Sequence, residues 1–368
     1  MEERNQIREQ MQESAALTLS RYKRLICRWA TGVGKSGVAL RFLSGNPGLS
    51  TLIVVPEINN IDNWWAEFDK FGVSRDNVTI ICYASLKNYA DTEWGLLILD
   101  ECPHVDTDLR AEVLGKIKAE HVLALGAVVS EEEQDVLEST YGHFHQSRVT
   151  LDMAISAGIL PQPTVCVMHM QLDNIHRMYK YDGRLCTAKE VYDTINAKVN
   201  GAVLAYNSSS TVWNQRKMLK LGNERKRFLG EQKTRAMGII CENLKQRNRR
   251  FLCFCSSIKQ AEQLGGEHAF TSKTPKSMDV LNRFNRHELD SLYVVGKLIE
   301  GQNLNDIDCG VIGQLGGQER ITTQSIGRIM RSMNPVIYVP VYDGTKDDSF
   351  MYSLRSSISD RYIKHYKL

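Results

Sequence analysis

Short apolar segments alternate with amphipathic segments along the first part of this chain, and this alternation constrains its fold more than any other feature. The apolar segments carry few charges and read RLICRW (24–29), STLIVVPE (50–57), VTIICYAS (78–85), GLLILDE (95–101) and HVLALGAVV (121–129). Amphipathic stretches such as NNIDNWWAEFDKFG (59–72) separate them. Continuous apolar strands separated by amphipathic helices are typical of a parallel sheet with helices on both faces. The first part is therefore predicted to be an α/β unit.

The alternation fades in the middle of the chain and then returns, which predicts a second unit. Residues 174–199 and 213–246 have helical patterns and are joined by the loop YNSSST (206–211). The later strand-like segments read RRFLCFCSS (249–257), EHAFTS (267–272), SLYVVGK (291–297), DCGVIG (308–313) and NPVIYVPVY (334–342). This second alternation again indicates a parallel sheet covered by helices.

The length of 368 residues is sufficient for two such units, each with its own core. We therefore expect an α/β fold in which residues 1–172 and 236–368 form two parallel-sheet units. Residues 173–235 are expected to form a helical, basic connector. The apolar segment 164–170 is placed as the last strand of the first unit.

Composition excludes several classes of protein. The apolar fraction of 42%, the charged fraction of 24% and the net charge of +3 are ordinary for a soluble globular chain. No apolar run approaches the roughly 18 residues of a membrane span, and the beginning, MEERNQIREQMQES, is too polar for a signal peptide. Nine cysteines without C-x-x-C spacing argue against a zinc or disulfide framework. We expect a cytoplasmic protein without a membrane partner.

The segment ATGVGKS (30–36) directly follows the first strand-like segment. Gly34, Lys35 and Ser36 match the end of the phosphate-binding pattern G-x-x-x-x-G-K-[ST], although Trp29 stands where the first glycine would be. Glycines let backbone N–H groups point at a phosphate, the lysine neutralises its charge, and the hydroxyl binds Mg²⁺. The helix predicted to follow adds the positive end of its dipole. The segment therefore predicts a site for a nucleotide phosphate and Mg²⁺.

Two more segments carry matching chemistry. Asp100 and Glu101 in GLLILDECPH end an apolar strand, at the sheet edge where α/β proteins bind ligands. One carboxylate suits Mg²⁺ and the other suits the attacking water. In QSIGRIMR (324–331), Gln324, Arg328 and Arg331 share one helix face, and two guanidinium groups there are well shaped to grip a γ-phosphate.

The order of these segments resembles that of superfamily-two helicases and translocases of the DExH type, closest in style to phage and mobile-element helicases and restriction-system motors. The matching segments are ATGVGKS (motif I), TLIVVPE (Ia), CYASLKN (before motif II), DECPH (II), FLCFCSS (IV), GKLIEGQNLNDID (V) and QSIGRIMR (VI). The resemblance covers nearly the whole chain. It implies two tandem RecA-like P-loop domains with ATP in the cleft between them, in a bacterial or phage-infected cell.

The resemblance also implies a role for each matching residue. The residues that would hold ATP are Thr31, Gly32, Val33, Gly34, Lys35, Ser36 and Gly301, with Gln12 reading the adenine. Ser36 and Asp100 would hold Mg²⁺, and Glu101 would position water. The residues that would reach the nucleotide from the second domain are Gln324, Arg328 and Arg331. His104 and Glu300 would couple the nucleotide to the strand. The residues that would touch nucleic-acid phosphates are Pro56, Ser85, Ser256 and Thr271.

Three departures from the family pattern affect this interpretation. Motif III is usually Ser-Ala-Thr, but here it reads Gly126-Ala127-Val128, with Ser130 nearby. Because those hydroxyls connect the motif II histidine to the ATP site and the second domain, their loss affects strand separation more than ATP hydrolysis. Ser325 replaces the Arg or His that often follows the motif VI glutamine. The pattern around Gln12 is loose, and Gln10 is the next candidate.

The resemblance predicts a nucleic-acid-stimulated ATPase that works as a DNA helicase or translocase, with DNA preferred over RNA. Two alternatives stay open: an ATP-gated clamp without strand separation, and an RNA helicase. Because few residues lie outside the two domains, a partner protein for targeting is also expected.

Two further features have both a functional and a structural interpretation. Residues 211–250 contain twelve Lys/Arg and three Asp/Glu, and they either track phosphates or form a solvated face. Trp64 and Trp65 either stack on bases or pack a helix onto the sheet.

Overall fold

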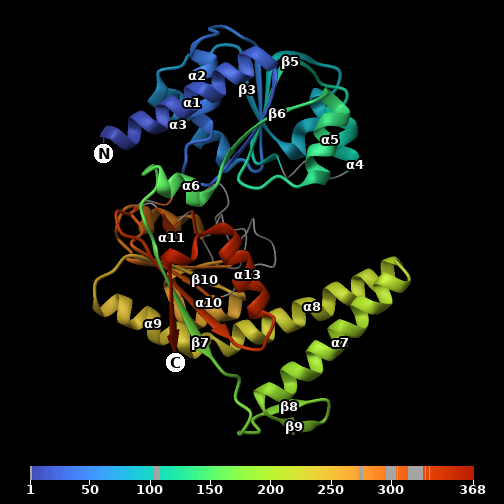
Figure 1. Ribbon diagram of the computed structural model, residues 1–368, viewed down its shortest axis with the longest axis vertical. Coiled ribbons are helices and arrows are strands. Elements are labelled where there is room, and N and C mark those ends of the chain that lie inside the picture. The colour runs from blue at the N-terminus through green and yellow to red at the C-terminus, as the bar shows by residue number, and fades with distance from the viewer. Residues whose placement is uncertain are drawn as a thin grey trace.

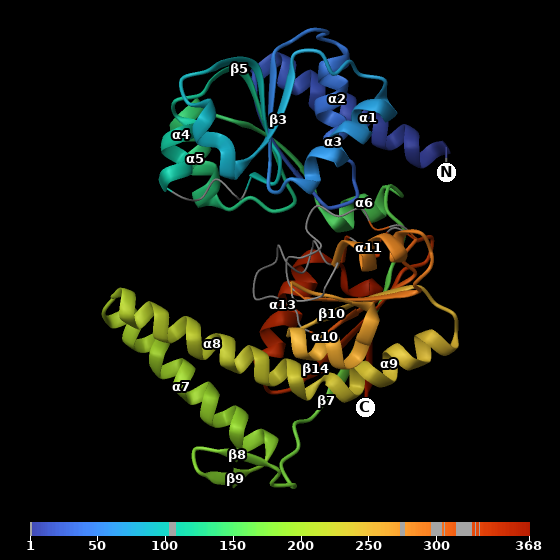
Figure 2. The same ribbon diagram turned by 180° about the vertical axis from the view of Figure 1, so that it is seen from behind.

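The computed structural model describes residues 2–102, 108–272, 277–295, 304, 306–313, 326–327, 329–330 and 332–368. It contains two α/β units, and a helical arm that projects from the second unit (Figures 1 and 2). None of the helices in these ranges is long and apolar enough to span a bilayer.

The first unit is a six-stranded parallel sheet in the order β3-β2-β4-β5-β1-β6. Its strands are β1 (Arg24–Trp29), β2 (Thr51–Val55), β3 (Val78–Cys82), β4 (Glu93–Leu99), β5 (Lys118–Gly126) and β6 (His145–Val149). All five predicted strands of this part form. The strand β6 was not predicted, because this edge strand is polar and only its last residue is buried.

Helices cover both faces of this sheet, which explains why its central strands are apolar without interruption. The helices and the 3₁₀ turn of the unit are α1 (Glu2–Tyr22), α2 (Ser36–Ser44), α3 (Asn59–Phe71), η1 (Tyr83–Tyr89), α4 (Asp108–Leu114) and α5 (Glu131–Tyr141). Alternate residues of β1, β2, β4 and β5 pack against α1, α2 and α3 on one face, and against α4 and α5 on the other.

The second unit is a seven-stranded parallel sheet in the order β11-β12-β10-β13-β14-β7-β15. Its strands are β7 (Thr164–Met170), β10 (Phe251–Cys255), β11 (Ala269–Phe270), β12 (Ser291–Val295), β13 (Cys309–Ile312), β14 (Val336–Tyr342) and β15 (Ile363–Lys367). Its helices and 3₁₀ turns are α9 (Thr234–Gln246), α10 (Ile258–Gly265), η3 (Gly266–His268), α11 (Ser277–Asn285), α13 (Asp347–Ser357) and η5 (Asp360–Tyr362). Helices α9 and α10 cover one face, and α11 and α13 the other. The predicted fold of two parallel α/β units is confirmed.

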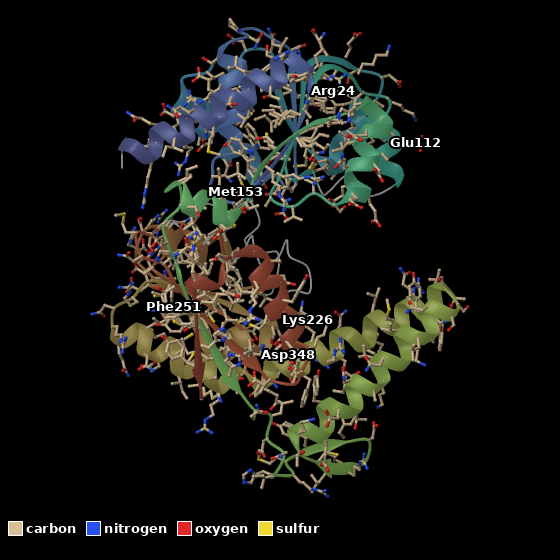
Figure 3. The ribbon with its side chains drawn as sticks, in the orientation of Figure 1. Arg24, Glu112, Met153, Lys226, Phe251 and Asp348 are labelled. Atoms are coloured by element: carbon tan, nitrogen blue, oxygen red, sulfur yellow. The ribbon has the colours of Figure 1, made fainter. Side chains whose placement is uncertain are left out.

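One strand differs from the prediction. β7 pairs with β14 along its whole length and with β15 on its other side, so it belongs to the second sheet. The sequence predicts it as the last strand of the first unit, and this prediction is wrong. Its apolar pattern suits the centre of either sheet, and only the tertiary pairing decides between them. The short helix α6 (Leu151–Ser156), which precedes β7, lies between the two units (Figure 1), and its residue Met153 is labelled in Figure 3.

The arm begins with a feature that the helical prediction missed. An antiparallel hairpin, β8 (Tyr179–Tyr181) and β9 (Arg184–Cys186), precedes the helices α7 (Ala188–Ser208) and α8 (Val212–Gln232). Its turn residues Asp182 and Gly183 both have positive φ, 47° and 82°. An Asp-Gly pair is the preferred turn of a two-residue hairpin, so this dipeptide was the signal that could have predicted it.

Buried polar contacts fix the arm to the second unit. Lys233, between α8 and α9, forms a 2.8 Å ion pair with Asp347, and both side chains are almost fully buried. The Tyr342 hydroxyl donates to the Gln232 carbonyl at 3.0 Å. Figure 3 labels Lys226 on α8 and Asp348 on α13 at this junction, and Lys226 and Phe350 line one small cavity there.

Candidate nucleotide site

The carboxyl ends of β1 and β4 bring the predicted phosphate loop and the predicted carboxylates together. Lys35 Nζ lies 3.9 Å from Glu101 Oε1 and donates to the Trp29 carbonyl at 3.3 Å. The Lys35 side chain is only 12% exposed. Lys35, Asp100 and Glu101 therefore share one site, as the sequence predicts for parallel strands that end at the same sheet edge.

The loop between β1 and α2 has the backbone of a phosphate cradle. Gly32 and Gly34 have φ of 89° and 96°, a left-handed conformation that glycine adopts without strain. The N–H groups of Gly34, Lys35 and Ser36 find no acceptor among the residues that the structure describes. The buried Thr31 Oγ1 also lacks a partner there. These unsatisfied groups fit a nucleotide phosphate, which would supply the missing acceptors.

Gln12 lies beneath this loop on α1 and is 3% exposed. Its Nε2 donates to the Gly34 carbonyl at 2.9 Å, and its Oε1 accepts from Arg41 Nε at 3.2 Å. A side chain at Gly37 would collide with this amide. The amide thus supports the loop from below, and its predicted role in reading adenine stays a prediction. Gln10, the other candidate, is exposed on the same helix.

Asp100 is held by two hydrogen bonds to its carboxylate. The Trp64 indole Nε1 donates to Oδ2 at 2.9 Å, and the Glu101 N–H donates to Oδ1 at 3.1 Å. Burial, and then the neighbouring Glu101 carboxylate, raise the pKa of Asp100 to about 6, while the Trp64 N–H opposes this rise. The Tyr83 hydroxyl donates to the Asp100 carbonyl at 3.1 Å, which fixes the end of β4. Asp100 and the Ser36 hydroxyl provide oxygen ligands of the kind that Mg²⁺ prefers.

Trp64 is the site residue whose role the sequence analysis missed. It is 4% exposed and bonded to Asp100, so stacking on bases is excluded for it in this conformation. Its neighbour Trp65 is half-buried and packs near Phe68. The Arg75 guanidinium carbon lies 5.2 Å from the centroid of the Trp65 ring. The contact between Trp64 and Asp100 joins residues 36 positions apart, and no local pattern predicts it.

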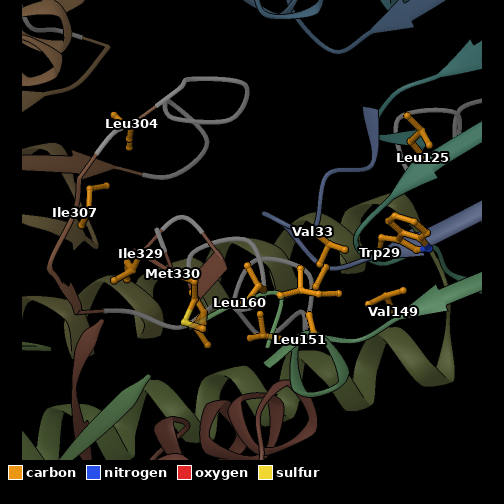
Figure 4. Packing of buried hydrophobic residues seen from close by; sticks show 14 of the residues in the cluster. Trp29, Val33, Leu125, Val149, Leu151, Leu160, Leu304, Ile307, Ile329 and Met330 are labelled. Atoms are coloured by element: carbon orange, nitrogen blue, oxygen red, sulfur yellow. The ribbon is translucent and has the colours of Figure 1, made fainter. Parts of the chain in front are cut away.

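A segment of the second unit reaches the phosphate loop. A Cβ placed on Gly327 would lie 2.6 Å from Thr31 Cβ and 3.1 Å from the Thr31 carbonyl oxygen, so the two backbones are in close contact. Val33, Leu160 and Met330 are buried in the same cluster beside this contact (Figure 4). Gly327 belongs to the segment predicted as motif VI, and the structure brings this one residue of the segment to the phosphate loop.

Several predicted site residues lie outside the described residues. They are His104, Glu300, Gly301, Gln324, Arg328 and Arg331. Their predicted roles stay predictions, although Gly327 and Ile329 next to Arg328 are described.

The four predicted contacts to nucleic-acid phosphates all follow strands. Pro56 comes directly after β2, and Ser85 lies in η1 directly after β3, at the sheet edge that carries the phosphate loop. Ser256 follows β10, and its hydroxyl donates to Gln260 Oε1 at 2.9 Å. Thr271 follows β11 and is fully buried, so a phosphate contact there requires rearrangement. These contacts stay predictions.

Comparisons with known proteins bear on the fold. No protein-family model matches the chain, and no curated protein matches it in sequence. The helicase domain of Hef from Pyrococcus furiosus is similar in structure, with a TM-score of 0.59 and 13% identity over 93% of this chain and 97% of that one. Mss116p, solved with ssRNA and AMP-PNP, has a TM-score of 0.58 and 13% identity over 94% of this chain and 71% of that one.

A third similar structure is the ATP-dependent Type ISP restriction-modification enzyme LlaBIII bound to DNA. Its TM-score is 0.59 and its identity is 14%, over 98% of this chain and 31% of that enzyme. At such low identity the likeness concerns the fold alone. The two parallel sheets agree with this likeness, and the chain has two tandem RecA-like α/β domains, a fold similar to that of these solved helicase structures.

Proposed function

We propose that this chain is a nucleic-acid-stimulated ATPase that works as a DNA helicase or translocase of the DExH type. One observation carries the proposal: Gly327 of the second unit contacts Thr31 of the phosphate loop in the first unit. A nucleotide bound at this loop would lie beside both units. Hydrolysis and release would then change how the units pack, and this change is what moves a motor along a strand.

Each residue of the nucleotide site in the first unit would have its own part in binding or hydrolysing ATP. Lys35 and the free N–H groups of the loop would bind the phosphates, and Ser36 and Asp100 would hold Mg²⁺. When bound, Mg²⁺ neutralises phosphate charge. Glu101, 3.9 Å from Lys35, would orient the attacking water and accept its proton.

The second unit would complete the site. Arg328 and Arg331 would stabilise the charge on the γ-phosphate, with Gln324 beside them. Gly301 would contact the nucleotide. Glu300 and His104 would couple the binding and hydrolysis of that nucleotide to the bound nucleic-acid strand. The residues that would hold the strand are Pro56, Ser85, Ser256 and Thr271. We place this activity in the cytoplasm of a bacterial or phage-infected cell, with a partner protein for targeting.

DNA is the proposed substrate because the sequence resembles recombination and restriction motors. Of the similar solved structures, LlaBIII is bound to DNA and Mss116p to ssRNA. An RNA helicase is therefore the alternative that an experiment has to separate from the DNA motor.

A second candidate function, an ATP-gated clamp without strand separation, is favoured by the end of β5. Gly126, Ala127 and Val128 carry no hydroxyl. Ser130, the nearest hydroxyl, caps α5: its Oγ accepts from the Glu133 N–H at 3.2 Å. This single hydroxyl, held at the helix cap, does not replace the two hydroxyls of the family's motif III.

Strand displacement and ATP turnover on matched DNA and RNA substrates test these functions. We expect single-stranded DNA and tailed duplex DNA to stimulate ATP turnover. We also expect the chain to displace the tailed strand from the duplex, or to displace a streptavidin block bound to that strand. Stimulation by RNA alone would favour the RNA helicase. ATP-dependent DNA binding with slow turnover, and no displacement of strand or block, would favour the clamp. Turnover that ignores every nucleic acid would contradict the motor.

A further inference from the structure

The arm, residues 179–232, leaves one face of α8 without a partner. Its two helices pack through a neighbouring face of α8, where Val199 and Val203 of α7 meet Leu221 and Phe228 of α8. The arm projects away from the second sheet, and α8 is its helix on the side of the first unit (Figures 1 and 2). The open face of α8 therefore contacts no other part of the described chain.

Four residues on this open face carry either a positive charge or an aromatic ring. Trp213, Arg216, Lys220 and Arg227 are spaced at i, i+3, i+7 and i+14, which places them within one narrow sector of a helix. All four are exposed, and the Trp213 side chain is 67% exposed. At a rise of about 1.5 Å per residue they extend over roughly 21 Å. We call these four residues the α8 stripe.

The cations of the α8 stripe form no close ion pair with the residues that the structure describes, although Glu224 and Glu231 follow Lys220 and Arg227 by four positions on the same helix. Within the described part of the chain, no carboxylate lies within 4.0 Å of Arg216, Lys220 or Arg227. On α7, in contrast, Lys189 pairs with Asp193 at 2.7 Å, and Lys198 pairs with Asp182 of the hairpin turn at 2.8 Å. Both lysines of α7 thus have an acidic partner, whereas the three cations of the stripe lie in solvent, which is the charge pattern that attracts a polyanion.

Trp213 adds a second, independent feature at the outer end of the stripe. Its indole is exposed where α8 begins, and Lys217 Nζ lies 5.1 Å from the ring centroid. Exposed aromatic rings beside backbone-binding cations are how proteins hold single-stranded nucleic acid, because every base can stack on such a ring.

We propose that the α8 stripe is a binding site for single-stranded nucleic acid. Arg216, Lys220 and Arg227 bind backbone phosphates, and Trp213 stacks on an unpaired base. This inference rests on the proposed function for the class of its ligand and adds a contact surface outside the two α/β units. Because α8 is fixed to the second unit through the buried Lys233–Asp347 pair, a strand held here moves with that unit.

The test compares two double variants of the full chain that remove the same charge from the same arm. Arg216→Gln/Lys220→Gln changes the stripe, and Lys189→Gln/Lys198→Gln changes the paired cations of α7. Binding of a labelled 20-nucleotide single-stranded DNA is measured by anisotropy, without nucleotide, over a series of KCl concentrations. Two lost phosphate contacts lower the slope of log K against log[salt] by about 1.4, since each contact to a single strand contributes about 0.7.

We expect this loss in the stripe variant and wild-type binding in the α7 variant. Trp213→Ala should weaken binding of single-stranded DNA by roughly 5- to 150-fold, the range expected for one lost stacking contact. It should leave binding of a blunt duplex of the same length unchanged. Melting temperatures and ATP turnover without nucleic acid should match the wild type in every variant.

The outcomes separate this inference from the proposed function. Equal salt slopes for the two double variants, or a wild-type chain that does not bind the single strand, would overturn the inference even if DNA stimulates ATP turnover. Equal loss of single-strand and duplex binding in Trp213→Ala would overturn the stacking role. Selective loss in the stripe variants would support the inference even if no nucleic acid stimulates turnover, in which case the motor function alone would fail.

Discussion

Replacing Trp64 by Phe tests whether the indole N–H positions the carboxylate that we propose for Mg²⁺. The change keeps an aromatic ring in the core but removes the donor that lies 2.9 Å from Asp100 Oδ2. The Glu101 N–H on Oδ1 remains. We therefore expect Asp100 to lose part of its orientation, and its pKa to rise further, because one of the groups that favours the ionised form is gone.

The size of the effect follows from the type of bond. A hydrogen bond to a charged group contributes about 1.5–3 kcal/mol, which corresponds to roughly 10- to 150-fold in an equilibrium constant. Loss of a group that orients a metal ligand typically costs about 10- to 100-fold in metal affinity. We expect the Mg²⁺ concentration for half-maximal binding of a fluorescent ATP analogue to rise by about 10- to 100-fold.

Trp65→Phe is the matched control, since Trp65 is the next residue of the same helix and has no bond to Asp100. Mg²⁺ titrations of analogue binding, with melting temperatures recorded in the absence of metal, compare the two variants with the wild type. A Mg²⁺ requirement within twofold of the wild type in Trp64→Phe would refute the positioning role. An equal increase in Trp65→Phe would assign the effect to packing instead.

Three more substitutions test other contacts. Gly327→Ala should reduce ATP turnover, because its Cβ would lie 2.6 Å from Thr31 Cβ and the two units would have to move apart there. Wild-type turnover would mean that the two units do not meet this way when ATP is bound. Lys233→Met leaves the buried Asp347 without its cation. Urea denaturation should therefore show a loss of about 3–5 kcal/mol in the free energy of unfolding. A loss below about 1 kcal/mol would contradict a buried ion pair. Gln12→Ala leaves a loop carbonyl without its donor, and we expect thermal denaturation to reveal a loss of about 1–3 kcal/mol; unchanged stability would argue against its support of the loop.

The sequence predicts the parts of the fold that depend on local patterns. The strands β1 to β5 are continuous apolar runs, and the glycines of the phosphate loop have the positive φ that such a loop requires. Two of the edge strands, β6 and β15, were not predicted, because each buries only one of its residues and so lacks an apolar pattern. The sheet that β7 joins depends on its pairing with β14, which is set by the tertiary fold and not by its own residues.

The candidate site also has residues that local patterns predict and residues that they do not. The order of motifs placed Lys35, Asp100 and Glu101 at one sheet edge, and the structure brings them together. The roles of Trp64 and Gln12 depend on contacts between segments that are distant in sequence. From the sequence, Trp64 was either a packing or a stacking residue. In the structure its indole N–H donates a hydrogen bond to the Asp100 carboxylate. Gln12 was assigned to adenine, and its amide is bonded to the phosphate loop.

ATP turnover, measured with and without single-stranded DNA in the wild type, Lys35→Ala and Glu101→Gln, tests the central claim most directly. We expect DNA to stimulate turnover in the wild type, and both variants to lose turnover. We also expect Glu101→Gln to bind an ATP analogue still, because that change removes the group that activates water and keeps the phosphate cradle. Turnover that survives both substitutions would place the active site elsewhere and would refute the proposed nucleotide site.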